Sequence, residues 1–457
     1  MTTPADGNRD PLEAQIARAH DEVVREKWAP ARYGTIPHIR IGKRWFNVLW
    51  LLPLACVGLV LGISIAHELF SLPAVQEFIA RYPGQPSGTV AYTGFPLWVR
   101  LAHVFNLFLM VFIVRSGIQI LADHPRLYWN KHCTPGTEWF RFQHEIPKGL
   151  IWTAKEDAVT IPGWLGLPGI RHSIGLARWW HFSCDLLWLT NGIVFYVLLF
   201  TTHQWERLVP TTWEVFPNAA STALQYLALR LPPDDGWIRY NSLQQIAYFV
   251  TVFLAAPAAV FTGLMQAPAI ANKFGFLGKL VNRQVARSIH FIILLWFVQF
   301  FFIHVTMVFI TGMRRNLNHI TLNNDTGSWD GAIIAFIVLT LLGALWMWAT
   351  PFTLKHARLV QQVGKTMVGW IKALMEHWDP KTQYSDKDIS PFLWPNGLVP
   401  ESAEYEELAD EAFEDYKLRV DGLCENPQEF SLAQLKAMPK QEQTTAHFFA
   451  FRDGRAS

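Results

Sequence analysis

Residues 286–310 read ARSIHFIILLWFVQFFFIHVTMVFI, an apolar run that contains two histidines, His290 and His304. About 20 apolar residues are enough to cross a bilayer as a helix. The histidines are fourteen positions apart, which is about four helical turns, or ~21 Å along the axis on nearly the same face. Ionisable side chains inside a membrane are costly and usually functional. The stretch therefore predicts a membrane helix that presents one histidine toward each of its ends.

The rest of the chain supports a membrane protein. Its residues are 51% hydrophobic and 17% charged, whereas soluble domains carry about 25% charged residues. The net charge of +2 gives no reason to expect a nucleic-acid partner. We predict an all-α integral membrane protein with six transmembrane helices, four of which form a core. The expected spans are 46–69, 97–121, 177–200, 243–265, 286–310 and 331–348.

Lys and Arg residues predict the orientation of these spans. Eight precede the first span, seven lie between the second and third when Arg178 is counted, and four lie between the fourth and fifth when Arg287 is counted. The alternate loops hold one, three and two. Because cytoplasmic loops are enriched in Lys and Arg, we expect both termini in the cytoplasm, although Arg314 and Arg315 go against the rule. The first 43 residues are polar and charged, so no cleavable signal peptide is expected.

Two more histidines, His103 and His181, lie inside expected spans. In the predicted orientation His103 lies at the outer depth of His304, and His181 lies at the inner depth of His290. Two imidazoles at one depth suit a six-coordinate haem iron, which favours electron transfer. Without a Cys-x-x-Cys-His sequence, covalent c-type attachment is excluded. We therefore expect two haem b (iron) groups, while a proton relay in a haem-free, proton-coupled transporter is the alternative from another class.

Three arginines precede histidines by three residues on the same helix, namely Arg100, Arg178 and Arg287. Residues three apart are neighbours on a helix surface, and Arg is well suited to carboxylates. We expect some of these side chains to bind haem propionates; the alternative is that they extend to the membrane interface. Arg115 and Asp185, in the inner halves of their spans, are expected to pair with each other, or else to serve proton movement near a quinone.

Residues 100–106 (RLAHVFN) and 179–181 (WWH) resemble the first two haem helices of the bacterial cytochrome b561, nickel-hydrogenase and formate-dehydrogenase cytochrome b superfamily. The fourteen-residue spacing in 286–310 is similar to that of its fourth. The resemblance covers about 95–312 and implies a four-helix di-haem core. It also implies electron exchange with quinone in the lipid of the bacterial plasma (inner) membrane, as an electron-transfer subunit rather than a self-contained enzyme. A hydrogenase or thiosulfate-reductase type anchor is the alternative within this class.

The C-terminal part carries a second resemblance. Residues 426–439 (NPQEFSLAQLKAMP) and 441–448 are similar to the opening of a sulfite-oxidase-type molybdopterin domain. Phe449 stands where that family has its molybdenum-binding cysteine. We interpret the tail as the truncated start of such a domain and expect a molybdopterin oxidoreductase partner on the cytoplasmic side. The alternatives are a tail that docks onto a separate molybdoenzyme and a chance likeness in a disordered acidic tail.

The expected organisation has four parts. Two polar regions flank a membrane domain. A basic amphipathic helix (351–378) and a linker (380–400) connect this domain to the acidic tail. Within the tail, residues 401–416 are expected to be helical. The parts are 1–43 (cytoplasmic), 44–350 (membrane), 351–400 (amphipathic helix and linker) and 401–457 (cytoplasmic, molybdopterin-domain-like).

Overall fold

The structure is a computed structural model of the chain. It describes residues 36–86, 91–142, 157–231, 236–267, 270, 281–378 and 402–441, together with the strands 445–449 and 452–456. The predictions made for 1–35 and for the linker 380–400 lie outside the described residues.

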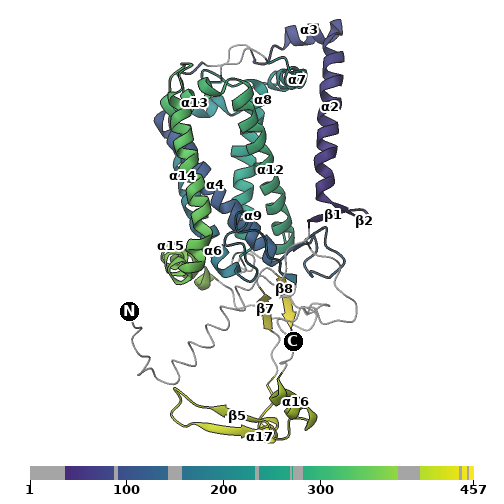
Figure 1. Ribbon diagram of the computed structural model, residues 1–457, viewed down its shortest axis with the longest axis vertical. Helices are drawn as coiled ribbons and strands as arrows, with labels where there is room; N and C mark the ends of the chain where they lie inside the picture. Colours follow the sequence, from purple (N-terminus) through teal and green to yellow (C-terminus); the bar gives the residue numbers. More distant parts are fainter. Residues whose placement is uncertain are drawn as a thin grey trace, which may run out of the picture.

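Six helical segments of the described chain are long and apolar enough to cross a membrane, as predicted. Most of the apolar surface of these segments is exposed rather than buried inside the protein. Such exposure is expected in a membrane, because lipid tails are as apolar as the side chains. Figure 1 shows that one of them, α2, stands apart from the other five. The segments are α2 (Leu51–Phe70), α4 (Leu97–Asp123), α6 (Ile174–Thr201), α8 (Ser242–Phe249) continued by η3 and α9 (Ala256–Met265), α12 (Arg283–Ile310) and α14 (Asp330–Lys355).

Two helix boundaries differ from the prediction. The first span was expected to begin at 46, but Phe46 belongs to a strand and a 3-10 turn (Val48–Trp50) precedes α2. The last span was expected to end at 348, yet α14 continues through Pro351 to Lys355. Membrane helices tolerate proline when other groups satisfy the freed backbone. The amphipathic helix is therefore shorter than predicted: α15 covers Ala357–Trp378.

The fourth span is irregular at its centre. Between α8 and α9 lies a π-helical turn, η3 (Val250–Ala255), followed at once by Pro257. A π-turn and a proline both interrupt the regular ladder of backbone hydrogen bonds. The interruption leaves backbone carbonyls available to side chains. One of them, the Val252 carbonyl, accepts a hydrogen bond of 2.5 Å from the Tyr196 hydroxyl.

Short elements cover the two ends of the bundle (Figure 1). One end, called here the α13 end, carries α3 (Pro73–Arg81), α7 (Val215–Leu227) and α13 (Met313–Leu322). The other, called the α15 end, carries α15 and a small antiparallel sheet of order β2-β1-β4-β3. The strands are β1 (His38–Ile41), β2 (Arg44–Asn47), β3 (Arg126–Leu127) and β4 (Phe140–Arg141).

Both structures at the α15 end pack tightly on the bundle. In the sheet, Ile39 lies opposite Phe140, and Phe140 is buried with Leu121 and Leu127 in a cluster that Phe291 of α12 contacts. On the other side, α15 lies against α6 so closely that a Cβ at Gly364 would come within 2.8 Å of the Trp179 ring. Glycine therefore permits this helix contact.

The described tail forms small separate elements below the α15 end in Figure 1. The segment that resembles a molybdopterin domain folds as a strand followed by a short helix whose first turn is capped by Ser431 and Gln434. The acidic stretch is helical only over α16, because Ala412 and Phe413 adopt positive φ angles. The elements are α16 (Ala403–Asp410), β5 (Lys417–Val420), β6 (Gln428–Ser431), α17 (Leu432–Ala437), β7 (Thr445–Phe449) and β8 (Arg452–Ala456).

Candidate functional site

The predicted histidines lie in two facing pairs. At the α13 end, His103 of α4 faces His304 of α12, with ring centroids 6.2 Å apart. At the α15 end, His181 of α6 faces His290 of α12, with ring centroids 6.4 Å apart. Each pair joins α12 to one neighbouring helix, so α12 contributes to both sites.

These separations fit one iron per pair. A bond from a metal to an imidazole nitrogen is about 2 Å long. Ring bonds of about 1.33 Å place the ring centre about 1.1 Å behind that nitrogen. Two imidazoles on opposite sides of one iron therefore have their centres about 6.3 Å apart, the spacing of both pairs. Edge-to-face contacts between rings span about 4.5–7 Å as well, so the spacing is compatible with an iron site and does not by itself require one.

Hydrogen-bonding groups next to Nδ1 orient the rings of the second pair, His181 and His290. His181 Nδ1 lies 3.1 Å from the Ile113 carbonyl and 3.1 Å from Ser116 Oγ. His290 Nδ1 lies 3.0 Å from Thr262 Oγ1. A proton on Nδ1 that is donated to these oxygens leaves Nε2 as the nitrogen that can bind metal. Sequence reasoning missed Ser116 and Thr262, whose only signal was a hydroxyl in an apolar span.

Two glycines leave room beside the same rings. A Cβ at Gly117 of α4 would lie 3.3 Å from His181 Cε1, and one at Gly263 of α9 would lie 3.5 Å from His290 Cε1. The first of these is tighter than ordinary carbon contacts, which have their optimum at about 3.5–4.0 Å. A larger residue at either position would press on an imidazole.

The first pair is positioned by rings. His304 stacks on Phe300 at 5.6 Å with an interplanar angle of 5° and meets Tyr248 edge-on at 6.1 Å. Two donors lie nearby on α4: the Nε1 of Trp98 and the Nε of Arg100 are buried and have no hydrogen-bond partner among the described residues. Such donors suit a carboxylate that the described chain does not supply, as a haem propionate would. Trp98 was not identified from the sequence.

The three arginines differ in what they contact. Arg100 donates from Nη1 to the Thr321 carbonyl at 2.8 Å and keeps its Nε for another acceptor. Arg287 uses both terminal nitrogens on backbone carbonyls, those of His124 and Arg126. Arg178 lies partly buried one turn before its histidine. Of the three, Arg100 is placed best for a propionate, and Arg287 fastens α12 to the loop after α4.

The expected pairing of Arg115 with Asp185 is wrong. Arg115 is buried and donates to the carbonyls of Trp346 at 2.8 Å and Gly163 at 2.5 Å, among other neutral acceptors. Asp185 lies instead 3.5 Å from Nε2 of His181. The loop after residue 157 and helix α14 supply neutral oxygens to both terminal nitrogens of the guanidinium, whereas its buried Nε has no hydrogen-bond partner among the described residues.

The comparisons with known proteins agree with this geometry. Residues 94–321, about half of the chain, match the family described as prokaryotic cytochrome b561. This part of the chain belongs to that family. One curated relative, from Azospira oryzae, bears the name "Putative protein-methionine-sulfoxide reductase subunit YedZ1" and is 26% identical over 219 residues, which are 48% of this chain and 90% of the relative. No solved structure matches the chain.

The cytochrome b561 segment contains all four paired histidines and the helices that carry them. Membership implies that the protein binds haem b and transfers electrons within a membrane. Helices α2 and α14 lie outside the matched segment. They are additions to the cytochrome b561 core, which spans α4 to α13.

At the α15 end of this cytochrome b561 core, a buried ionic cluster holds the loop after α4. Arg126 binds Asp157 at 2.9 Å and Glu138 at 2.8 Å, and all three side chains are almost fully buried. Burial alone would lower the pKa of Arg126, but the two carboxylates raise it. The loop also reaches α12 directly, because Trp139 Nε1 donates to Ser288 Oγ at 2.9 Å. The segment is thereby fixed two residues from His290.

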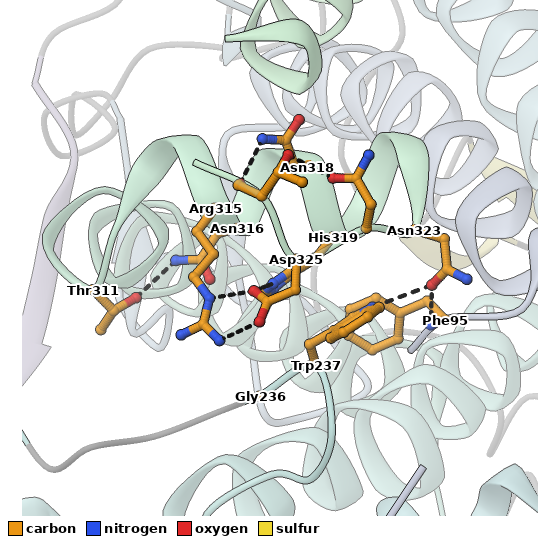
Figure 2. A network of polar contacts seen from close by, with 12 residues as sticks. Phe95, Gly236, Trp237, Thr311, Arg315, Asn316, Asn318, His319, Asn323 and Asp325 are labelled. Carbon is orange, nitrogen blue, oxygen red and sulfur yellow. Dashed lines mark hydrogen bonds and ion pairs between the residues drawn. The ribbon is translucent and has the colours of Figure 1, made fainter. Parts of the chain in front are cut away.

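At the α13 end, Figure 2 shows a second polar network, which joins α13 to Asp325 and Trp237. Arg315 holds Asp325 through two contacts, one of 2.6 Å between Nη2 and Oδ2. The Asp325 carboxylate also contacts His319 Nε2 at 2.7 Å, and His319 stacks on Trp237. The hydrogen bond from Arg315 holds the pKa of Asp325 well below its usual range. The charge of Arg315 is therefore neutralised locally.

The same network fixes the chain that enters α4. Asn323 Oδ1 accepts hydrogen bonds from the Phe95 backbone at 2.7 Å and from Trp237 Nε1 at 3.1 Å (Figure 2). Gly94, with a φ of +80°, lies so close that a Cβ would come within 2.2 Å of Asn323 Oδ1. A glycine is needed there for both reasons. This contact positions the first turns of α4, which carry Arg100 and His103.

Proposed function

We propose that the chain carries electrons across the bilayer through two b haems, one held by His103 and His304 and the other by His181 and His290. The observation that supports this most directly is the equal spacing of the two pairs, 6.2 and 6.4 Å, which leaves room for one iron between each pair of rings. A bound haem supplies reversible one-electron chemistry at its iron. With both histidines of a pair bound to it, the iron would have no open site for oxygen and would serve electron transfer.

The surrounding residues serve to hold and orient the cofactors. Oxygens of Ile113 and Thr262 fix the ring orientation at the α15 end. We assign Arg100 and Trp98 to a propionate at the α13 end, since each has a buried donor nitrogen to offer. Arg178 is assigned to a propionate at the α15 end, on its position one turn from His181. Arg287 is assigned mainly to anchoring, although a propionate contact was expected from sequence.

The proposed partners are a quinone in the bilayer and a molybdopterin-dependent oxidoreductase in the cytoplasm. The α15 end is placed on the cytoplasmic side of the bacterial plasma membrane, with both termini, because basic loops gather there. A reductase partner is supported by the name of the Azospira oryzae relative and by the tail's resemblance to a molybdopterin domain. Electrons would then pass between the partner and the His181–His290 pair, and quinone would exchange at the His103–His304 pair.

The test is a reduced-minus-oxidised visible spectrum of the purified protein together with its haem content per chain. A b-type spectrum and two haems are expected. His290→Ala and His304→Ala should each lose one haem. His67→Ala removes an exposed histidine of α2 that belongs to neither pair, and it should retain both. Absence of a b-type spectrum would favour the haem-free transporter, and retention of both haems in His290→Ala would disprove the pairing.

A further inference from the structure

The loop segment 126–141 forms a rigid wall beside His290. Its buried Arg126 and Glu138 form a cluster with Asp157, which lies outside the segment, and Trp139 donates to Ser288. Ser288 Oγ also donates to the Tyr128 carbonyl at 2.8 Å. The backbone on both sides of the loop is thus tied to the first turns of α12. A surface of this kind presents side chains at fixed positions and loses little entropy on binding a partner.

A continuous series of aromatic contacts runs through this wall. Trp129 is 46% exposed and stacks on Trp139, with ring centroids 5.5 Å apart and an interplanar angle of 19°. Trp139 in turn contacts Phe291, with ring centroids 6.2 Å apart. Phe291 follows His290 directly in α12. The contacts therefore connect an exposed indole with the residue beside a proposed iron ligand.

Among the described residues, the exposed charged side chains on the two stretches beside Trp129 are all basic. The hairpin of β1 and β2 lies beside the segment, because the Arg40 backbone bonds to the Trp139 carbonyl and its guanidinium to the Gly136 carbonyl. Lys43, Arg44 and Lys131 are exposed on these two stretches. Residues 36–47 and 129–137 contain no Asp or Glu. We call the group of Arg40, Lys43, Arg44, Trp129 and Lys131 the Trp129 surface.

We propose that the Trp129 surface is the docking site for an acidic electron-transfer protein that exchanges one electron with the iron held by His181 and His290. One partner loses the electron and the other gains it, and no bond is formed or broken. This inference rests on the proposed function. A protein is favoured over lipid because Trp and Arg, both present here, are enriched among the residues that dominate binding at protein interfaces. Basic groups around it select a partner with negative charge and speed the encounter.

The test uses the full-length, haem-loaded protein in nanodiscs of uncharged lipid, with plant-type ferredoxin as the probe. This carrier is small and acidic and has a reduction potential of about −400 mV. Binding is measured by surface plasmon resonance, and the rate of haem reduction by stopped-flow spectroscopy. The variants are Lys43→Glu/Arg44→Glu, Lys131→Glu and Trp129→Leu. The matched controls are Arg358→Glu/Lys365→Glu on α15 and Trp164→Leu, which alter exposed residues at the same end of the molecule.

The charge reversals should weaken ferredoxin binding and the second-order rate roughly tenfold at low salt, and the difference should fade as salt rises. Trp129→Leu should lower the rate at saturating ferredoxin while leaving the haem spectrum unchanged. Effects of equal size in the α15 and Trp164 controls, or none in the test variants, would disprove the proposal. Loss of co-purifying anionic lipid with unchanged ferredoxin binding would show that the basic groups contact the bilayer, and would also disprove it. If the wild-type protein shows no b-type spectrum, it is the proposed function that fails.

Discussion

Replacing Gly117 with alanine should loosen the haem that we assign to His181 and His290 and leave the haem assigned to the other pair intact. The added Cβ would lie 3.3 Å from His181 Cε1, which is at least about 0.2 Å inside the optimum for two carbons. The ring cannot slide away freely, because its Nδ1 is held at 3.1 Å by both Ile113 and Ser116. The strain must therefore appear in the position of the imidazole.

Overpacking of this kind costs about 1–3 kcal/mol. Since each 1.4 kcal/mol is a factor of ten, the affinity for that haem should fall between about 5-fold and 150-fold. Alanine also gains about 1 kcal/mol over glycine as a helix former. Gly192→Ala in α6 provides the matched control, because a Cβ there meets nothing within 4 Å and the helix gain is the same.

The assay is the rate at which each variant loses haem to an excess of apomyoglobin, followed by its visible spectrum. Gly117→Ala should show two phases, one fast and one at the wild-type rate, whereas Gly192→Ala should match the wild type. If Gly117→Ala loses haem within twofold of the Gly192→Ala rate in both phases, the close approach of α4 to the His181 ring has no role in holding the cofactor.

Three further predictions concern side chains around the core. Thr262→Val removes the oxygen behind His290 Nδ1, which makes the ligand less basic; redox potentiometry should show one midpoint potential raised and the other unchanged. Arg126→Met leaves two buried carboxylates without their main partner, and thermal unfolding should show a loss of about 3–5 kcal/mol. Asp325→Asn breaks the partly exposed pair with Arg315, at a cost of about 1 kcal/mol or less at pH 7. Because the pKa of Asp325 is depressed in the folded state, its contribution is present above about pH 4 and is lost as the pH falls through the folded-state pKa.

Each of these predictions has a result that contradicts it. Thr190→Val removes a hydroxyl bonded to the Leu186 carbonyl, and an equal shift in that variant would show that Thr262 has no special effect. A loss below about 1 kcal/mol in Arg126→Met would show that the carboxylates find other partners or protons. For Asp325→Asn, the difference in melting temperature between wild type and variant should shrink as the pH falls. A difference that stays constant from pH 7 to pH 2 would show that Asp325 is not the titrating group.

The membrane spans could be predicted because about 20 apolar residues in a row leave few alternatives to a membrane helix. The short helices and strands that cover the two ends of the bundle could not be predicted. Helix α13 reads MRRNLNHITL, and so polar a sequence is typical of a loop until its contacts are known. Its asparagines, Asn316 and Asn318, bond to carbonyls of the neighbouring loop and of α12. The four-stranded sheet was missed for a related reason, since strands of two to four residues depend on partners that lie far away in the chain.

The depth of each histidine followed from the sequence, and the helix rotations did not. The positions of the histidines in their spans and the predicted orientation of the spans place His181 and His290 at the same depth. The groups that bond to their Nδ1 atoms depend instead on how α4 and α9 pack. Ser116 lies 65 residues from His181, and Thr262 lies 28 from His290. No local pattern indicates such contacts. The failed pairing of Arg115 has the same cause, because its acceptors include Trp346, 231 residues away.

The anomaly in the basic residues also has a physical explanation. Arg315 was counted against the expected orientation, yet the structure pairs it with Asp325 ten residues later. The Arg314 guanidinium lies over the Trp329 ring, 5.3 Å from its centroid. Both arginines thus have local partners at the α13 end, which a count of Lys and Arg does not register.

Helix α12 supplies one histidine to each pair, and this has a consequence for how the sequence can change. The distance between the two sites is set by the fourteen residues from His290 to His304 alone, at ~1.5 Å per residue. Substitutions between them alter packing, but a single inserted or deleted residue would rotate His304 by about 100° and turn it away from His103. Variants of this protein should therefore tolerate exchanges at exposed positions of 291–303 such as Leu295 and Phe302 and tolerate no change in the length of this stretch.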